Sequence, residues 1–170
     1  MPEPLEVEIA RLGRHGDGAD AAGEVFAPFT LPGERIRGVP AEGRIEAPKI
    51  LRPAPARVAP PCPAFGRCGG CALMHASDAF LADWKRDRIA EALARVGLEA
   101  DIAETAVSPP RSRRRAALSG RRLKRGALVG FHARRGAEIV PLDACRVLVP
   151  EIVAARDALA EVAALAASRK

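Results

Sequence analysis

The sequence predicts an α+β protein in which a small OB-like β-barrel precedes a cysteine-rich loop and an antiparallel sheet with packed helices. Three observations lead to this fold class. Short segments of alternating apolar and polar residues recur up to about residue 57, three cysteines follow within ten residues, and helical patterns flank further alternating segments after them. A chain of 170 residues has no room for a complete cofactor-binding α/β domain beside these parts.

Residues 1–58 are predicted to form the barrel. Alternating segments give short strands at 5–9, 25–29, 34–39 and 43–51, joined by turns rich in glycine and proline. Such a barrel is often a nucleic-acid-binding module. The glycines at 13, 16 and 18 do not have the spacing of a dinucleotide-binding motif, and no helical pattern follows them, so we exclude that function.

Residues 59–170 are predicted to form the second domain, because five prolines between residues 53 and 63 make a stiff linker. A helix should begin after Ser77 as N-cap and end at Gly97, with Trp84 packed in the core. Strands are expected at 113–122, 127–131 and 138–142, with a hairpin at 123–126. A closing helix should begin at Pro150 and bury one apolar face, which comprises Ile152, Ala155, Leu159, Val162 and Ala166.

The four cysteines predict one four-coordinate metal centre with no thiol left over. Three of them have the spacing C-x5-C-x2-C, and the fourth lies far downstream, so a metal would join two distant parts of the chain. Gly69 and Gly70 are expected to adopt positive φ and to direct their amide N–H groups at sulfur. The predicted ligands are Cys62, Cys68, Cys71 and Cys145.

Disulfide bonds are the first alternative for these cysteines. The acidic amino terminus has no apolar core typical of a signal peptide, and no run of 18 apolar residues occurs, so we expect a cytoplasmic protein without a membrane segment. Thiols stay reduced in the cytosol, which favours metal. Zinc is the second alternative, but zinc sites usually show two close cysteine pairs, so the spacing favours an iron–sulfur centre with a structural rather than a redox role.

The positive charge of the chain is concentrated in one segment. Residues 105–146 hold eleven of the 27 Lys and Arg residues and two of the 21 acidic ones, whereas the rest of the chain has a net charge of −3. This asymmetry predicts a polyanionic partner, most simply nucleic acid, although a solvated basic face is the alternative. We expect the protein to be a monomer. The predicted RNA contacts are Arg113, Arg114, Arg115, Arg121, Arg122, Lys124, Arg125, Arg134 and Arg135.

Recognition of RNA shape and charge is more plausible than base stacking, because Phe131 and His132 are the only rings in this segment suited to stacking. His75, which follows the cysteine motif, is interpreted either as a hydrogen-bond donor near the metal or as a structural histidine.

Several motifs together resemble the amino-terminal part of the TRAM-domain, iron–sulfur RNA (uracil-5-)-methyltransferases. The matching residues are Val25-Phe-x-Pro-x-x-Leu-Pro-Gly-Glu34, Cys62-x5-Cys68-Gly-Gly-Cys71-Ala-Leu-x-His75, Trp84-Lys85, Ser112-Arg-Arg-Arg-Ala116, Gly130-Phe-His132 and Glu138-Ile-Val…Asp143-x-Cys145. The resemblance extends from about residue 5 to residue 155. It implies a TRAM barrel, a [4Fe–4S] cluster on the four cysteines and binding of 23S rRNA or tRNA.

The chain departs from that family in one respect. Members carry a carboxy-terminal domain with the S-adenosylmethionine site, a nucleophilic cysteine and a carboxylate base, and none of these has a counterpart here. The resemblance therefore implies that the methyl donor acts only through the missing catalytic domain and that this chain is inactive alone. Two other functions stay open: a stand-alone RNA-binding module stapled by a metal, and an iron–sulfur electron-transfer protein.

Overall fold

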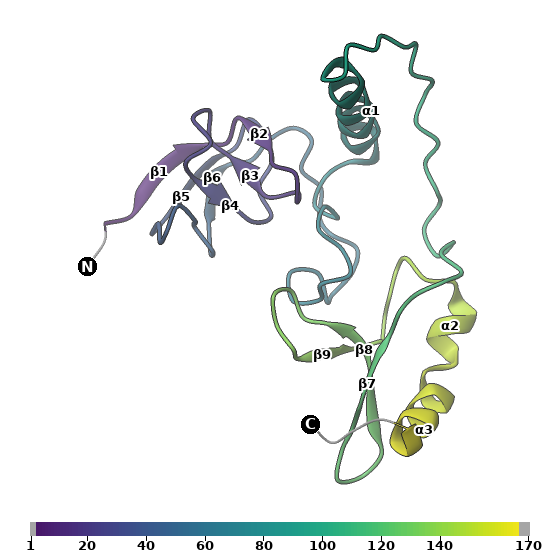
Figure 1. The fold of residues 1–170 in the computed structure, drawn as a ribbon. Helices are drawn as coiled ribbons and strands as arrows, with labels where there is room; N and C mark the ends of the chain where they lie inside the picture. The colour runs from purple at the N-terminus through teal and green to yellow at the C-terminus, as the bar shows by residue number, and fades with distance from the viewer. Residues whose placement is uncertain (1–2, 167–170) are drawn as a thin grey trace. The chain divides into compact units, whose positions relative to one another are not determined.

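The computed structural model describes residues 3–166, which group into two compact units (Figure 1). The first unit contains the residues up to Ala59 together with Ala72–Val107, and the second contains Pro60–Cys71 together with the residues from Ser108 onward. The domain boundary was predicted after residue 58, and the chain first passes from the first unit to the second between Ala59 and Pro60. The helix after the cysteine loop groups with the first unit rather than with the second domain, because its apolar residues pack there.

The first unit contains six short strands in two antiparallel sheets, with orders β1-β5-β6 and β2-β3-β4. The predicted strands at 5–9, 25–29 and 34–39 are confirmed in shortened form. The strand predicted at 43–51 begins only at residue 49, because Gly43 lies in a turn and the chain bends at Glu46 and Ala47. The strands are β1 Leu5–Glu8, β2 Arg11–Leu12, β3 Gly18–Ala19, β4 Phe26–Ala27, β5 Arg35–Gly38 and β6 Lys49–Arg52.

The predicted barrel is not closed within the described residues. The two sheets are separate ladders, and β4 reaches the segment before β6 only through an isolated bridge between Phe26 and Arg44. Strands β2, β3 and β4 have two residues each, which is too short to carry a continuous ladder around a barrel. One buried cluster of Ile9, Ala27, Ile36 and Ile45 nevertheless joins residues from both sheets into a common core.

Helix α1, Asp78–Ala94, packs on a second core cluster of the same unit. Ser77 caps it as predicted, since its hydroxyl accepts a hydrogen bond from the Phe80 amide at 3.3 Å. Trp84 also packs as predicted, together with Phe80 and Leu81. Only the first part of the helix contacts this core, and further along Ile89 is 52% exposed. The cluster consists of Leu12, Leu31, Ala54 and Ala76.

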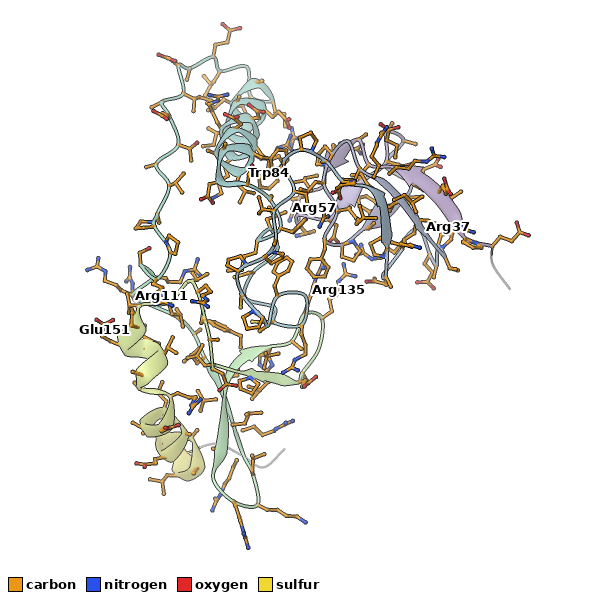
Figure 2. The ribbon with its side chains drawn as sticks, turned by 180° about the vertical axis from the view of Figure 1, so that it is seen from behind. Arg37, Arg57, Trp84, Arg111, Arg135 and Glu151 are labelled. Carbon is orange, nitrogen blue, oxygen red and sulfur yellow. The ribbon has the colours of Figure 1, made fainter. Side chains whose placement is uncertain are left out.

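A buried ion pair joins the turn before β5 to the proline-rich segment. The carboxylate of Glu34 is fully buried and accepts hydrogen bonds from the Leu31 and Ala54 amides, at 2.9 and 3.2 Å. Arg57 donates to both of its oxygens, at 2.5 and 2.8 Å, and also to the carbonyl of Phe29 (Figure 2). The segment predicted as a linker is therefore tied to the first unit through Arg57.

The second unit is built on the predicted antiparallel meander. Strands β7 Ser119–Arg122, β8 Ala127–His132 and β9 Ile139–Pro141 pair in chain order. The hairpin at 123–126 is confirmed, since the Leu123 amide donates to the Gly126 carbonyl at 3.0 Å. The strand predicted at 113–122 is present only in its last four residues, because Arg113 instead pairs in parallel with Leu148 after β9.

Two helices, α2 Pro150–Ala154 and α3 Arg156–Ala166, follow the sheet where one was predicted. The start at Pro150 is confirmed, and α3 contacts β7 and β8, beside which it lies in Figure 1. The predicted apolar face is only partly covered, since Val162 is 62% exposed. No helix within residues 3–166 has both the length and the apolar character needed to cross a membrane.

Gly130 is required by the close approach of β8 to β9. A Cβ atom at this position would lie 1.9 Å from the Val140 carbonyl oxygen, which is a backbone atom in a sheet and cannot move aside. We expect Gly130→Ala to destabilise the second unit by about 2 kcal/mol. Amide hydrogen exchange of β8 and β9 measures this effect.

Gly136→Ala is the matched control for Gly130→Ala. Its Cβ would meet only the Ala133 Cβ, at an ordinary 3.8 Å, and its φ is not positive, so exchange should stay at the wild-type rate. Equal exchange in the two variants would contradict the assigned role of Gly130.

Candidate metal centre and nucleic-acid interface

The cysteine loop of the second unit folds through local turns and then pairs with the turn between β8 and β9. The amides of Phe65 and Cys68 donate to the carbonyls of Cys62 and Ala64, at 3.1 and 2.9 Å, and so coil the first half of the loop. Cys68 then forms an antiparallel bridge with Ala133. Backbone hydrogen bonds of 2.9 Å flank this bridge, from Gly69 to His132 and from Arg134 to Arg67.

The two glycines of the loop act differently from the prediction. Neither Gly69 nor Gly70 has positive φ, so the expected left-handed backbone was wrong. Gly69 is required by close approach instead, because a Cβ there would lie 2.8 Å from the His132 carbonyl oxygen. The Gly70 amide donates to the Cys68 sulfur at 3.4 Å, as expected for an amide directed at a thiolate.

All four cysteines are reduced and half-buried, and all four belong to the second unit. The pKa of the Cys71 thiol is raised, first by burial and then by the negative charges of Cys145, Cys68 and Cys62, while Arg113 opposes the shift. The four thiols therefore influence one another electrostatically. Within residues 3–166, however, no three thiol, imidazole or carboxylate groups are gathered closely enough to hold a metal ion.

Cys145 is positioned by the strand-like pairing of its neighbours. The amides of Arg111 and Arg113 donate to the carbonyls of Arg146 and Val147, and the Val149 amide donates back to Arg113. These bonds, of 3.0 to 3.1 Å, fix the segment after β9 beside the segment that leads to β7. They also place Arg113 near the cysteines, which explains its effect on the pKa of Cys71.

The nine predicted RNA-binding residues all lie in the second unit, on three segments. One group lies in the extended segment before β7, one on β7 and its hairpin, and one on the turn after β8, where Figure 2 labels Arg135. Arg121 is half-buried and Arg122 exposed, as expected for alternate positions of a strand, so the set cannot follow one phosphate track as a whole. The exposed members are Arg113, Arg114, Arg115, Arg122, Lys124, Arg125 and Arg135.

Sequence reasoning missed three arginines of the same unit. Arg67 is exposed inside the cysteine motif, where its carbonyl accepts the hydrogen bond from Arg134. Arg111 and Arg146 are exposed beside Cys145 and lie in the segment whose positive charge was counted, so they could have been found by that count alone.

His75 belongs to the first unit and is 1% exposed. Its ring meets Phe29 edge-on, with 6.2 Å between the ring centroids. Its carbonyl accepts a hydrogen bond from the Val58 amide at 2.9 Å. These contacts support the interpretation of His75 as a structural histidine.

The proteins to which this chain is similar are RNA methyltransferases. It is 42% identical over 164 residues to an uncharacterized RNA methyltransferase of Caulobacter vibrioides, covering 93% of this chain and 39% of the relative. It is 37% identical over 164 residues to one of Brucella suis, covering 95% and 40%. The chain thus spans about two fifths of the length of these relatives. No family model matches it.

One of the relatives has a name that specifies the RNA and the base that it methylates. The chain is 34% identical to the 23S rRNA (uracil(1939)-C(5))-methyltransferase RlmD of Alkalilimnicola ehrlichii, over 88% of this chain and 36% of that protein. Among solved structures, it is similar to the tRNA (uracil-54, C5)-methyltransferase of Pyrococcus abyssi in complex with S-adenosyl-L-homocysteine, with a TM-score of 0.59. That match covers 91% of this chain and 35% of the other, and its identity of 23% shows a shared fold alone.

Proposed function

We propose that this chain is the RNA-binding part of an S-adenosylmethionine-dependent RNA uracil-C5 methyltransferase and carries a [4Fe–4S] cluster. The observation that supports this most directly is its similarity to RNA methyltransferases over more than 90% of its length. The motifs that resemble the TRAM-domain family extend over the same residues. The TRAM-like unit and the basic second unit would together bind RNA.

The second unit supports RNA binding through exposed guanidinium and ammonium groups on an ordered scaffold. The β7–β8 hairpin and the turn after β8 present them from one antiparallel sheet, and the segment before β7 adds Arg113, Arg114 and Arg115. Such groups neutralise phosphates and fix the position of RNA without reading its sequence. Of the two rings suited to stacking in this segment, Phe131 is half-buried and only His132 is exposed, so recognition of shape and charge is favoured over extensive stacking.

The donor set fits an iron–sulfur cluster held by Cys62, Cys68, Cys71 and Cys145. The four thiols are reduced, the other three raise the pKa of Cys71, and the Gly70 amide already donates to the Cys68 sulfur. Binding must draw the thiols closer together, since they do not yet form a group that could hold a metal ion. Once bound, the cluster would supply a covalent link between the cysteine loop and the segment after β9. Zinc on the same thiolates is the alternative.

The relatives are longer than the part that this chain matches. We propose that the remaining part of such a protein binds the methyl donor and carries the attacking nucleophile. The chain covers 36–40% of the relatives named above. All four of its cysteines are assigned to the metal, so none is left to attack a uracil ring. The chain alone should therefore bind RNA without transferring a methyl group from S-adenosylmethionine.

Replacing Arg113, Arg114 and Arg115 together by alanine should weaken RNA binding at least tenfold. Log K falls as log salt rises, with a slope of about −0.7 for each phosphate contact to a single strand. Loss of three contacts should therefore make this slope less negative by about 2. Fluorescence anisotropy of a labelled, uridine-containing RNA stem–loop, titrated at several salt concentrations, measures both quantities.

The control carries the same change of charge on α1, with Arg86, Arg88 and Arg95 replaced by alanine. Arg86, the half-buried Arg88 and the C-cap residue Arg95 pair only with Asp83 and Glu91 of the same helix, so RNA affinity should stay within about twofold of the wild type. Failure of the wild-type chain to bind RNA would overturn the proposed function. Equal weakening by the two triple variants would show that net charge, rather than this surface, determines binding.

A further inference from the structure

The second unit contains a cavity of about 530 Å³ beside Cys145, bounded by the segment after β9 and by α2 and α3. Of the four cysteines, Cys145 alone is on its wall, so the cavity is separate from the space that the four thiols would share around a metal. None of the nine predicted RNA-binding residues lines it. Its volume is in the range of pockets that hold a small ligand such as one nucleotide.

The charges around this cavity favour an anion. Three arginines and two aspartates line it, and Arg156 donates to Asp143 and Asp157 at 2.7 and 2.9 Å. Both carboxylates therefore already have a cationic partner. Arg111 and Arg146 are exposed, and neither forms an ion pair within residues 3–166. Guanidinium groups that no carboxylate occupies are suited to donate paired hydrogen bonds to a phosphate.

The backbone holds these two arginines together at a conformational cost. The Arg111 amide donates to the Arg146 carbonyl at 3.0 Å. Arg111 has φ of 58°, in the left-handed region that a side chain with a Cβ atom disfavours and glycine does not. Arginine at such a position in the turn at 110–111 is strained, and this strain is compatible with a role for its side chain in binding. Figure 2 labels Arg111 close to the start of α2.

The remaining wall is apolar. Leu148, at 1% exposure, forms its buried base, and Pro150 and Val153 supply the accessible apolar surface on α2. A ribose or a base can pack on such a surface while its phosphate contacts the arginines. We propose that this cavity binds one nucleotide unit of the RNA, with its phosphate between Arg111 and Arg146 and its nucleoside against Leu148, Pro150 and Val153. This inference rests on the proposed function and adds a defined subsite to it.

The variant Arg111→Gly separates a binding role from a structural one. Glycine removes the guanidinium and also relieves the left-handed backbone, so thermal stability should be unchanged or higher. Affinity for the labelled RNA stem–loop should nevertheless fall about tenfold, and Arg146→Ala should have a similar effect. The control Arg86→Ala removes one exposed arginine from α1 and should leave affinity within twofold.

The outcomes distinguish this inference from the function on which it rests. If the wild-type chain does not bind RNA, the proposed function is overturned. RNA binding that is unchanged in both Arg111→Gly and Arg146→Ala would overturn only the nucleotide site.

Backbone amide NMR of the wild-type chain with uridine 5′-monophosphate, uridine and inorganic phosphate supplies a second readout. Shifts across residues 143–157 should be largest with the monophosphate. Equal shifts with inorganic phosphate would reduce the site to an anion site and overturn nucleoside recognition. No shifts with any of the three would overturn the site.

Discussion

Replacement of Arg57 by alanine is expected to destabilise the first unit by about 3 kcal/mol. Glu34 is fully buried, and Arg57 is its only cationic partner among the described residues. Removal of one partner from a buried ion pair leaves a charge without solvation, which typically costs 3–5 kcal/mol. The same substitution also removes the hydrogen bond to the Phe29 carbonyl, so the turn before β5 loses its connection to the proline-rich segment.

Urea unfolding followed by the fluorescence of Trp84 measures this loss. Trp84 is the only tryptophan and packs on the core cluster of the same unit, so its signal reports that unit. Arg52→Ala is the matched control, because Arg52 and Glu8 form an ion pair of 3.4 Å with both side chains more than half exposed. An Arg57→Ala variant as stable as Arg52→Ala would show that the Glu34–Arg57 pair contributes little.

The same pair predicts how stability depends on pH. Burial alone would raise the pKa of Glu34, but the hydrogen bonds from Arg57, Leu31 and Ala54 outweigh burial and hold the pKa below the ordinary value of 4.5. A carboxylate with a lowered folded-state pKa contributes stability above its unfolded-state pKa and loses it as the pH falls. The wild type should therefore lose stability below about pH 4.5, and Glu34→Gln should lose less over that range.

Features set by local chemistry were predicted well from the sequence. Ser77 and Pro150 mark helix starts because a hydroxyl cap and a fixed φ act within one turn. The hairpin at 123–126 and the meander follow from alternation and one turn glycine. Each of these signals lies within a few residues of the structure that it determines.

Features that depend on distant partners were not predicted. Arg57 lies in a proline-rich stretch that resembles a linker, and its buried partner is 23 residues away, so no local pattern connects the two. Barrel closure was predicted from strand spacing, yet pairing between the two sheets depends on register that alternation does not specify. The sequence predicted core packing for Trp84, but it did not indicate that only the first part of α1 contacts the core.

The candidate site divides in the same way. Spacing singled out the four cysteines and the charge distribution singled out the basic segment, and the structure brings the cysteines and the basic residues of that segment into one unit. The need for Gly69 was recognised for the wrong reason, since the close approach of the His132 carbonyl is a tertiary contact. Arg111 lies in the basic segment that the charge count singled out, but its positive φ and its place at the cavity beside Cys145 are visible only in the structure.

Replacement of Cys145 by serine is expected to abolish the metal centre and to loosen the second unit. Protein purified without oxygen should be brown and contain about four iron and four sulfide per chain, whereas the variant should be colourless and contain almost none. A structural metal contributes to folding directly, on the order of 10 kcal/mol for zinc in small domains, so the effect should exceed that of any other single substitution considered above.

The structural consequence of Cys145→Ser should be localised. Amide exchange should increase where the cysteine loop pairs with the turn after β8, at Gly69 and Arg134, and where Arg113 pairs with Val147 and Val149. Ala144→Ser is the control, because it adds the same hydroxyl to the adjacent exposed position without removing a thiol. Wild-type protein stripped of metal by a chelator should show the exchange pattern of the variant.

Two results would change the assignment of the centre. One zinc per chain and no colour would replace the iron–sulfur cluster by zinc and keep the four-cysteine link between the loop and the segment after β9. Full iron content in Cys145→Ser would remove Cys145 from the ligand set. In that case the segment after β9 would depend only on its backbone pairing with Arg111 and Arg113, and exchange there should not respond to metal removal.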